Sequence, residues 1–252
     1  MALTETDVGL YHSGPTHGKT AFTTGSFTPP ASSLLVVIVY ALIDATGNIG
    51  QPTISGGSLT WTYVGQARLE TSWADRMSVF TAPVGASPSS MTVVVDDDTN
   101  QTVSIWQVAV FAFEGYDVST PIAGFVTSNT TDVGDGAETQ TLTATPATDD
   151  ITISAVNTQA NSAVSASFDT GWSVIFGWGT ANYSYLTVAT RPNSTSDSVA
   201  CTDTRPGTGT FYYASMLSFI VKAAVAATGQ PTSVRSFGVP TRHGMDRPGR
   251  WN

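Results

Sequence analysis

The sequence predicts an all-β protein: a two-sheet antiparallel β-sandwich, jelly-roll-like, with an extended C-terminal arm. Three observations lead to this fold class. Charged residues make up 12% of the 252 residues, about half the usual share, so few side chains are available to cover solvent-facing helices. The apolar segments are rich in β-branched and aromatic residues, which favour strands. Gly, Pro, Asn and Asp separate these segments, as expected at turns.

Three long apolar segments are expected to form the core strands. They are residues 34–43 (LLVVIVYALI), 103–117 (VSIWQVAVFAFEGYD) and 211–221 (FYYASMLSFIV). In the segment 103–117 both alternating sets of side chains are largely apolar, so neither face is plainly polar. A strand of this kind belongs in the middle of a sheet, with a layer covering each face.

Shorter segments are expected to supply the remaining strands, and they suggest an internal repeat. The expected strands are residues 8–12, 20–27, 59–66, 76–82, 91–95, 139–145, 151–158, 172–178, 183–190 and 199–202, with loops at 44–57 and 191–197. The first half has Trp61, then a strand, a polar turn and the segment 77–83. The second half has a similar succession, Trp172 followed by the segment 185–192. In each half this hairpin leads to a short strand and then to a long apolar one. Two similar halves suit a sandwich in which each half gives strands to both sheets. The alternative is a chance similarity among strands rich in Thr and Val.

The chain is predicted to divide into a body, residues 1–227, and an arm, residues 228–252. The arm holds four arginines and one aspartate, a net charge of +3, whereas the rest has 6 basic and 18 acidic residues, or −12. The arm is too poor in apolar residues to fold alone, yet apolar anchors recur within it. We therefore expect it to become ordered on a neighbouring subunit. Its partner-binding residues are expected to be Arg235, Phe237, Arg242, Met245, Arg247, Arg250 and Trp251.

Several classes of function are disfavoured by composition. An acidic body argues against binding nucleic acid, and the longest apolar run, 10 residues, is short of the roughly 20 that cross a bilayer as a helix. The first residues lack the basic and apolar regions of a secretory signal. Synthesis in a cytoplasm is therefore expected, although the Thr/Ser/Gly-rich composition is typical of extracellular β proteins. A virus particle that assembles in the host cytoplasm and is then released reconciles the two.

No enzyme activity and no cofactor are expected. His12, His17 and His243 are the only histidines, and no G-x-S-x-G nucleophile motif is present. Cys201 is the only cysteine, so an intrachain disulfide is excluded and a small apolar core residue is the expected role.

One acidic stretch has the opening of a calcium loop. Asp96, Asp98 and Asn100 follow the D-x-D-x-N spacing, but Gln101 and Gln107 stand where an EF-hand has Gly and Glu. A sandwich could still bind Ca²⁺ there with ligands from elsewhere. The alternative, which we favour, is a charged turn that keeps the following strand soluble.

Aromatic residues in hairpin and loop positions make a glycan-binding surface the alternative function. Trp73, in a polar connection, is the best single candidate, and Trp178 and Tyr183 are the others. Rings of this kind also dominate the cores of β-sandwiches, so packing between the sheets is the competing reading.

The strand motifs of the first half carry a resemblance to a known class. The succession G-S-L-T-W-T-Y-V-G, M-S-V-F-T-A-P-V-G, M-T-V-V-V and V-A-V-F-A-F-E-G-Y-D resembles a β-sandwich domain common in structural proteins of tailed bacteriophages. The arm, ending V-P-T-R-H-G-M-D-R-P-G-R-W-N, is also similar to tails of phage virion proteins. The resemblance spans roughly residues 30–222. It implies a virion component on the head, tail or fibre, most simply a capsid decoration protein that binds other virion proteins and forms homo-oligomers; the glycan-binding alternative implies a host surface glycan as partner.

Overall fold

The structure, a computed structural model, describes residues 2–14, 18–43, 50–69, 74–98, 102–131, 136–159, 166–179, 184–203 and 213–225. Over these ranges the chain forms sixteen strands and no helix. All the ladders between them are antiparallel. The predicted all-β antiparallel sandwich is thereby confirmed; the arm lies outside the described residues.

The strands divide evenly between two halves of the chain. The first half holds β1 (Thr4–His12), β2 (Ala21–Thr23), β3 (Leu34–Leu42), β4 (Pro52–Ser55), β5 (Thr62–Leu69), β6 (Asp75–Pro83), β7 (Val94–Asp97) and β8 (Ile105–Glu114). The second half holds β9 (Ile122–Thr131), β10 (Gly136–Thr141), β11 (Ile151–Gln159), β12 (Ala166–Phe168), β13 (Ser173–Gly179), β14 (Tyr185–Pro192), β15 (Ser198–Asp203) and β16 (Tyr213–Val221).

The two halves have the same sheet topology. The first half forms a five-stranded sheet, β1-β8-β3-β6-β5, and a three-stranded sheet, β2-β7-β4. The second half forms β13-β14-β11-β16-β9 and β10-β15-β12, so adding eight to each label of the first half reproduces the second. Pairing of the first strand with the eighth and of the second with the seventh is the jelly-roll pattern of nested hairpins.

The predicted repeat is therefore real, and its sequence signals mark equivalent places. Trp61 and Trp172 directly precede β5 and β13, and both strands carry a bulge two residues into the strand. Pro83 and Pro192 end β6 and β14, where each pairs with the first residue of β3 or β11.

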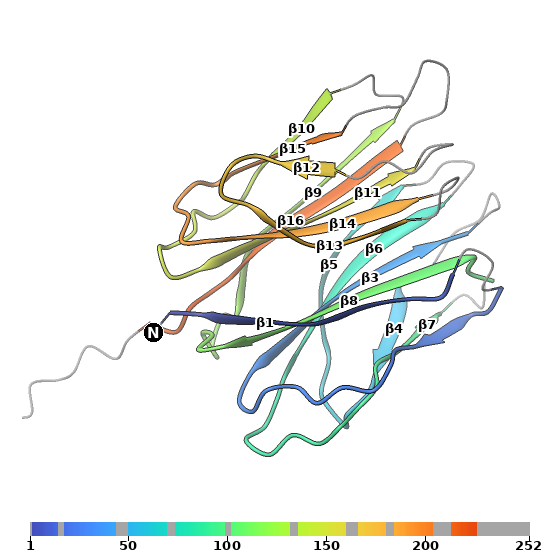
Figure 1. Ribbon diagram of the computed structural model, residues 1–252, viewed down its shortest axis with the longest axis horizontal. Helices are drawn as coiled ribbons and strands as arrows, with labels where there is room; N and C mark the ends of the chain where they lie inside the picture. The colour runs from blue at the N-terminus through green and yellow to red at the C-terminus, as the bar shows by residue number, and fades with distance from the viewer. Residues whose placement is uncertain are drawn as a thin grey trace, which may run out of the picture.

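The prediction that each half gives strands to both sheets of one sandwich is wrong. Each half builds its own five- and three-stranded sheets, and the two five-stranded sheets face each other in the middle of the molecule (Figure 1). One apolar core lies between these two sheets, and each half has a further core under its three-stranded sheet. The four layers explain why strands such as β3 and β8 are apolar on both faces: one face serves the shared core and the other serves the core of its own half.

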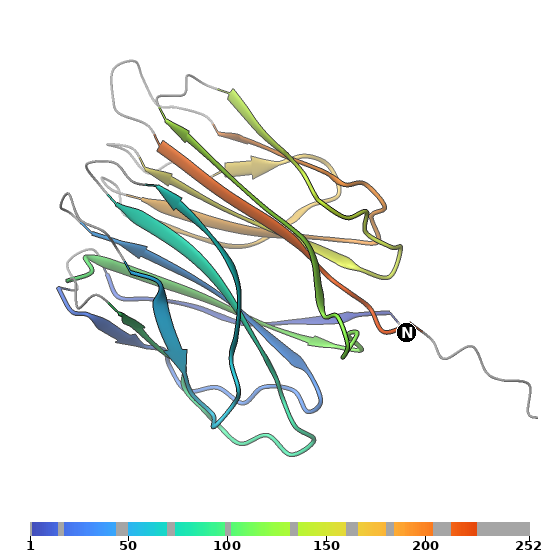
Figure 2. The same cartoon turned by 180° about the vertical axis from the view of Figure 1, so that it is seen from behind.

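The sandwich has two distinct ends. At one end, the arm pole, β1 begins beside the end of β8, and β16 ends beside the start of β11. The described chain ends there as well: Ala224 donates its N–H to Gly115, the residue after β8, and the end of β16 lies near the N-terminus (Figure 2). At the other end, the hairpin pole, β5 turns into β6 and β13 turns into β14.

Candidate functional site

The predicted site residues fall into two groups. Asp96, Asp98 and Trp178 lie in the described part of the chain. The others lie outside it: Asn100, Trp73, Tyr183, Arg235, Phe237, Arg242, Met245, Arg247, Arg250 and Trp251.

The described part of the calcium candidate is a strand end. Asp96 is half-buried on β7 and Asp98 is exposed in the turn that follows, whereas Asp97 between them is 2% exposed. Among the described residues no three His, Cys, Asp or Glu side chains come close enough to share a metal ion. Asp96 and Asp98 therefore lack a third acidic ligand within this part of the chain.

A layer of buried polar side chains crosses the shared core near the hairpin pole. The first half contributes Tyr40, Asp75 and Gln107, and the second half contributes Asn157, Gln159, Ser184 and Ser215; all are at most 4% exposed. We call these seven residues the polar layer. Their places in the ladders make Tyr40 equivalent to Asn157 and Gln107 to Ser215. Ser184 directly precedes β14, at the place that corresponds to Asp75 at the start of β6. The two halves thus place polar groups at the same positions of the same strands.

Asp75 is the centre of this layer. Its Oδ2 accepts a hydrogen bond of 2.8 Å from the Asn157 amide and a second from the Gln159 amide, both on β11 of the other half. Burial raises the pKa of Tyr40 well above its usual value, and the nearby Asp75 charge raises it further; Ser184, Gln159 and Asn157 oppose the rise. Tyr40 is therefore a neutral hydroxyl, and the two hydrogen bonds accepted by Asp75 join the halves here.

A stacked pair of rings lies beside the polar layer, since His12 pairs with Gln107 in the β1–β8 ladder. His12 of β1 and Trp178 of β13 stack with centroids 3.9 Å apart and an interplanar angle of 15°. Partial burial lowers the pKa of His12, which favours the neutral ring. Trp178 also packs against the shared core. This candidate glycan-binding residue is therefore partly buried in the core and partly exposed.

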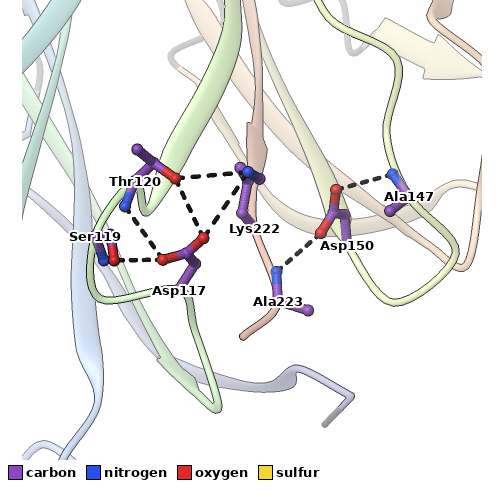
Figure 3. A network of polar contacts seen from close by, with 7 residues as sticks. All are labelled: Asp117, Ser119, Thr120, Ala147, Asp150, Lys222 and Ala223. Atoms are coloured by element: carbon purple, nitrogen blue, oxygen red, sulfur yellow. Dashed lines mark hydrogen bonds and ion pairs between the residues drawn. The ribbon is translucent and has the colours of Figure 1, made fainter. Parts of the chain in front are cut away.

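At the arm pole, the connection between the halves clamps the segment that leads into the arm (Figure 3). Backbone N–H groups of Asp117 and Ala224 donate to the carbonyls of Lys222 and Gly115, each at 2.8 Å, and Lys222 N–H donates to Pro121 at 2.9 Å. The exit segment, residues 222–224, is therefore held along the linker, residues 115–121.

Two carboxylates reinforce this clamp. Asp117 accepts hydrogen bonds from the N–H groups of Ser119 and Thr120, and these bonds lower its pKa. Its Oδ2 lies 3.9 Å from the Lys222 ammonium. Asp150 accepts from the N–H of Ala147 and from that of Ala223, each at 2.8 Å (Figure 3). Because backbone groups are the partners, the direction in which the chain leaves the body is fixed.

A second acidic pair lies between the halves on β1. Burial raises the pKa of Glu5 to about 7, the Asp7 charge adds to the rise, and a hydrogen bond with Thr190 of β14 opposes it. Burial also raises the pKa of Asp7. Folding therefore favours protonation of Glu5.

Stability is expected to fall as pH rises through the range set by Glu5. The folded protein holds a proton at Glu5 up to about pH 7, whereas the unfolded chain releases it near 4.5, so raising the pH between these values favours unfolding. Thermal melts of the wild type and of Glu5→Gln across this range should show the larger fall in melting temperature for the wild type. If the melting temperatures of the two proteins change with pH in the same way, folding does not raise the pKa of Glu5.

Cys201 and the described histidine, His12, lie in packed positions. Cys201 is 2% exposed in the core of the second half, and His12, in the first half, stacks on Trp178. His17 and His243 lie outside the described residues.

Sequence comparison adds no relative. No protein-family model matches the chain, and no curated protein or solved structure is significantly similar to it. None of the described segments is a helix long and apolar enough to span a membrane. The class of protein is therefore described by its structure alone. It is a β-sandwich made of two jelly-roll-like halves, in which hydrogen bonds hold the exit segment against the linker.

Proposed function

We propose that this chain is a non-enzymatic structural protein of a tailed-bacteriophage particle, a capsid decoration protein anchored partly through its C-terminal arm. One observation carries the proposal: the clamped exit at the arm pole lies at the opposite end from the β5–β6 and β13–β14 hairpins. A body built this way can be attached by one end and displayed by the other. The opposite charges of arm and body, +3 and −12, support attachment of the arm to acidic protein surfaces.

Removing the arm is expected to weaken binding to the particle. Full-length protein should co-sediment with purified phage capsids, and the fragment 1–227 should bind at least about tenfold more weakly, a loss of about 1.4 kcal/mol. A full-length variant with Arg242, Arg247 and Arg250 changed to alanine separates the contribution of charge from that of chain length. Equal binding of full-length protein and fragment would contradict attachment through the arm, and no binding by either would contradict capsid decoration.

A glycan-binding adhesion module on a tail or fibre is the second candidate, and the stacked pair at the hairpin pole favours it. Trp178 lies at this pole, and so do Ala74 and Ser184, which directly follow Trp73 and Tyr183 in the chain. Aromatic faces beside polar groups are what a sugar-binding surface requires.

A glycan array distinguishes this candidate from the first. Binding to a bacterial surface polysaccharide should fall at least about tenfold in Trp73→Ala, which corresponds to about 1.4 kcal/mol, while the melting temperature stays unchanged. Absence of binding across host polysaccharides would count against an adhesion role and leave particle attachment as the function.

A further inference from the structure

A groove of about 470 Å³ opens at the arm pole between an edge strand of each half. β5 contributes Thr62, Tyr63 and Val64 to its walls, and β9 contributes Ile122, Ala123 and Phe125. Both strands are irregular here: Val64 is an extra residue opposite β6, and β9 carries an extra residue opposite Phe219. Phe125 packs directly over Gly65, where a Cβ atom would lie only 2.4 Å from its ring. The aromatic ring therefore fills the base of the groove, and the space above it stays open.

The two walls of the groove end in unpaired sheet edges. Within the described residues, the one ladder partner of β5 is β6 and the one ladder partner of β9 is β16. Unpaired edges are templates for an added strand, and native proteins usually cover or charge them. An extended peptide bound at such an edge gains backbone hydrogen bonds, and neighbouring pockets select its side chains.

Exposed apolar side chains gather at the same end of the molecule. The described part of the chain has four exposed large apolar residues: Tyr63 (36%), Val118 (79%), Val174 (52%) and Val225 (82%). Val118 belongs to the linker, and Val225 directly follows the exit segment. Tyr63 and Val174 occupy equivalent places near the starts of β5 and β13. Their concentration at the arm pole marks it as an interaction surface.

The clamp directs the chain away from its own groove. The exit segment runs from Lys222, bonded to Pro121 beside the groove, to Ala224, bonded to Gly115 at the end of β8. β8 and β1 lie toward the opposite edge of the five-stranded sheet from β5, and the full width of five strands is about 19 Å. An arm that continues in this direction leads away from its own groove and toward a second copy. Its length would also allow it to turn back, and the disulfide experiment below separates the two.

We infer that the groove binds residues 234–239 of the arm of a second copy, with Phe237 beside Tyr63. The segment reads V-R-S-F-G-V and is followed by Pro240. In an extended conformation Phe237 and Val239 point to one side, and Pro240 ends the pairing because it has no N–H. The twelve residues from Val225 to Phe237 span at most about 40 Å, which is enough to reach a neighbour. A basic arm on an acidic body adds electrostatic attraction.

This inference does not depend on the proposed attachment to a phage particle. Arm exchange links copies of the chain to one another, and Arg242, Arg247 and Arg250 follow the docked segment and remain for other partners. Failure of capsid binding would leave arm exchange intact, and loss of arm exchange would leave capsid binding to be explained by the arginines.

The oligomeric state in solution tests the inference. Light scattering after size-exclusion chromatography should show that full-length protein forms oligomers and that the fragment 1–227 is monomeric. Thr62→Arg, which adds a bulky cation to an exposed position in the groove, should shift the full-length protein to monomers, as should Phe237→Ala. Ser173→Arg is the matched control, because it adds the same side chain to the equivalent exposed position on β13; it should leave the oligomer intact. A monomeric full-length protein, or equal effects of Thr62→Arg and Ser173→Arg, would overturn the proposal.

Disulfide trapping separates exchange between copies from folding back on the same chain. Thr62→Cys and Phe237→Cys proteins, mixed and oxidised, should give a covalent dimer that contains one of each. A Thr62→Cys/Phe237→Cys double variant that closes a bond within one chain, and forms no covalent dimer, would overturn exchange.

Discussion

Replacing Phe111 with alanine is expected to reduce the free energy of unfolding by about 3–5 kcal/mol. The side chain is 0% exposed in the shared core. It stacks on Phe113, with centroids 6.3 Å apart, and meets Phe176 of the other half at 5.0 Å. The substitution therefore leaves a cavity at the contact between the halves, and the loss is a large fraction of the roughly 5–15 kcal/mol that stabilises a typical domain. Urea unfolding followed by circular dichroism measures it.

Phe237→Ala is the control for this expectation. Phe237 belongs to the arm. At protein concentrations low enough for both proteins to be monomeric, the variant should unfold at nearly the same urea concentration as the wild type, while assembly weakens at higher concentrations. If both substitutions destabilise the monomer equally, the arm is part of the core, and the division of the chain near residue 227 is wrong.

The sequence predicts the central strands well because burial on both faces leaves a plain pattern. β3, β8 and β16 start within two residues of the expected segments and end within three. Trp61 and Trp172 could reveal the repeat because each lies just before an edge strand that bulges at the same place.

The weakly patterned strands could not be predicted. β4 and β12 have only four and three residues, too few for a period to show. β9 includes Gly124, which has a φ of +64°, and its second half, T-S-N-T-T, is polar because the strand lies at an edge. Edge strands with one partner need little apolar alternation.

The packing of the two halves against each other could not be predicted from the sequence pattern either. A strand that is apolar on both faces fits the middle of a two-sheet sandwich and the inside of a four-layer stack equally well. Gln107 is the one signal of the polar layer that the sequence offers, since it interrupts the apolar set Ile105, Ala109, Phe111 and Phe113. The contacts that join the layer, from Asn157 and Gln159 to Asp75, link positions more than eighty residues apart in the chain, and only the packing of the two halves brings them together.

Asp75→Ala is expected to destabilise the protein by about 3–5 kcal/mol, although Asp75 has no part in the apolar core. The substitution removes the acceptor shared by two buried donors, the Asn157 and Gln159 amides. A buried donor without a partner costs about 1–3 kcal/mol, and loss of one member of a buried charged network costs a similar total. Because these bonds join the two halves, unfolding should also become less cooperative. Urea unfolding followed by both circular dichroism and tryptophan fluorescence detects this as two transitions that no longer coincide.

Ser184→Ala is the matched control, because Ser184 occupies the position in the second half that Asp75 occupies in the first. It is equally buried, and its hydroxyl lies near Tyr40 without making a hydrogen bond of normal geometry. Its loss should cost less than about 1 kcal/mol. Asp75→Asn keeps the shape and one carbonyl acceptor but loses the charge, so its effect should lie between the other two. If Asp75→Ala costs no more than Ser184→Ala, the halves are joined by apolar packing alone, and the polar layer is not what binds them at the hairpin pole.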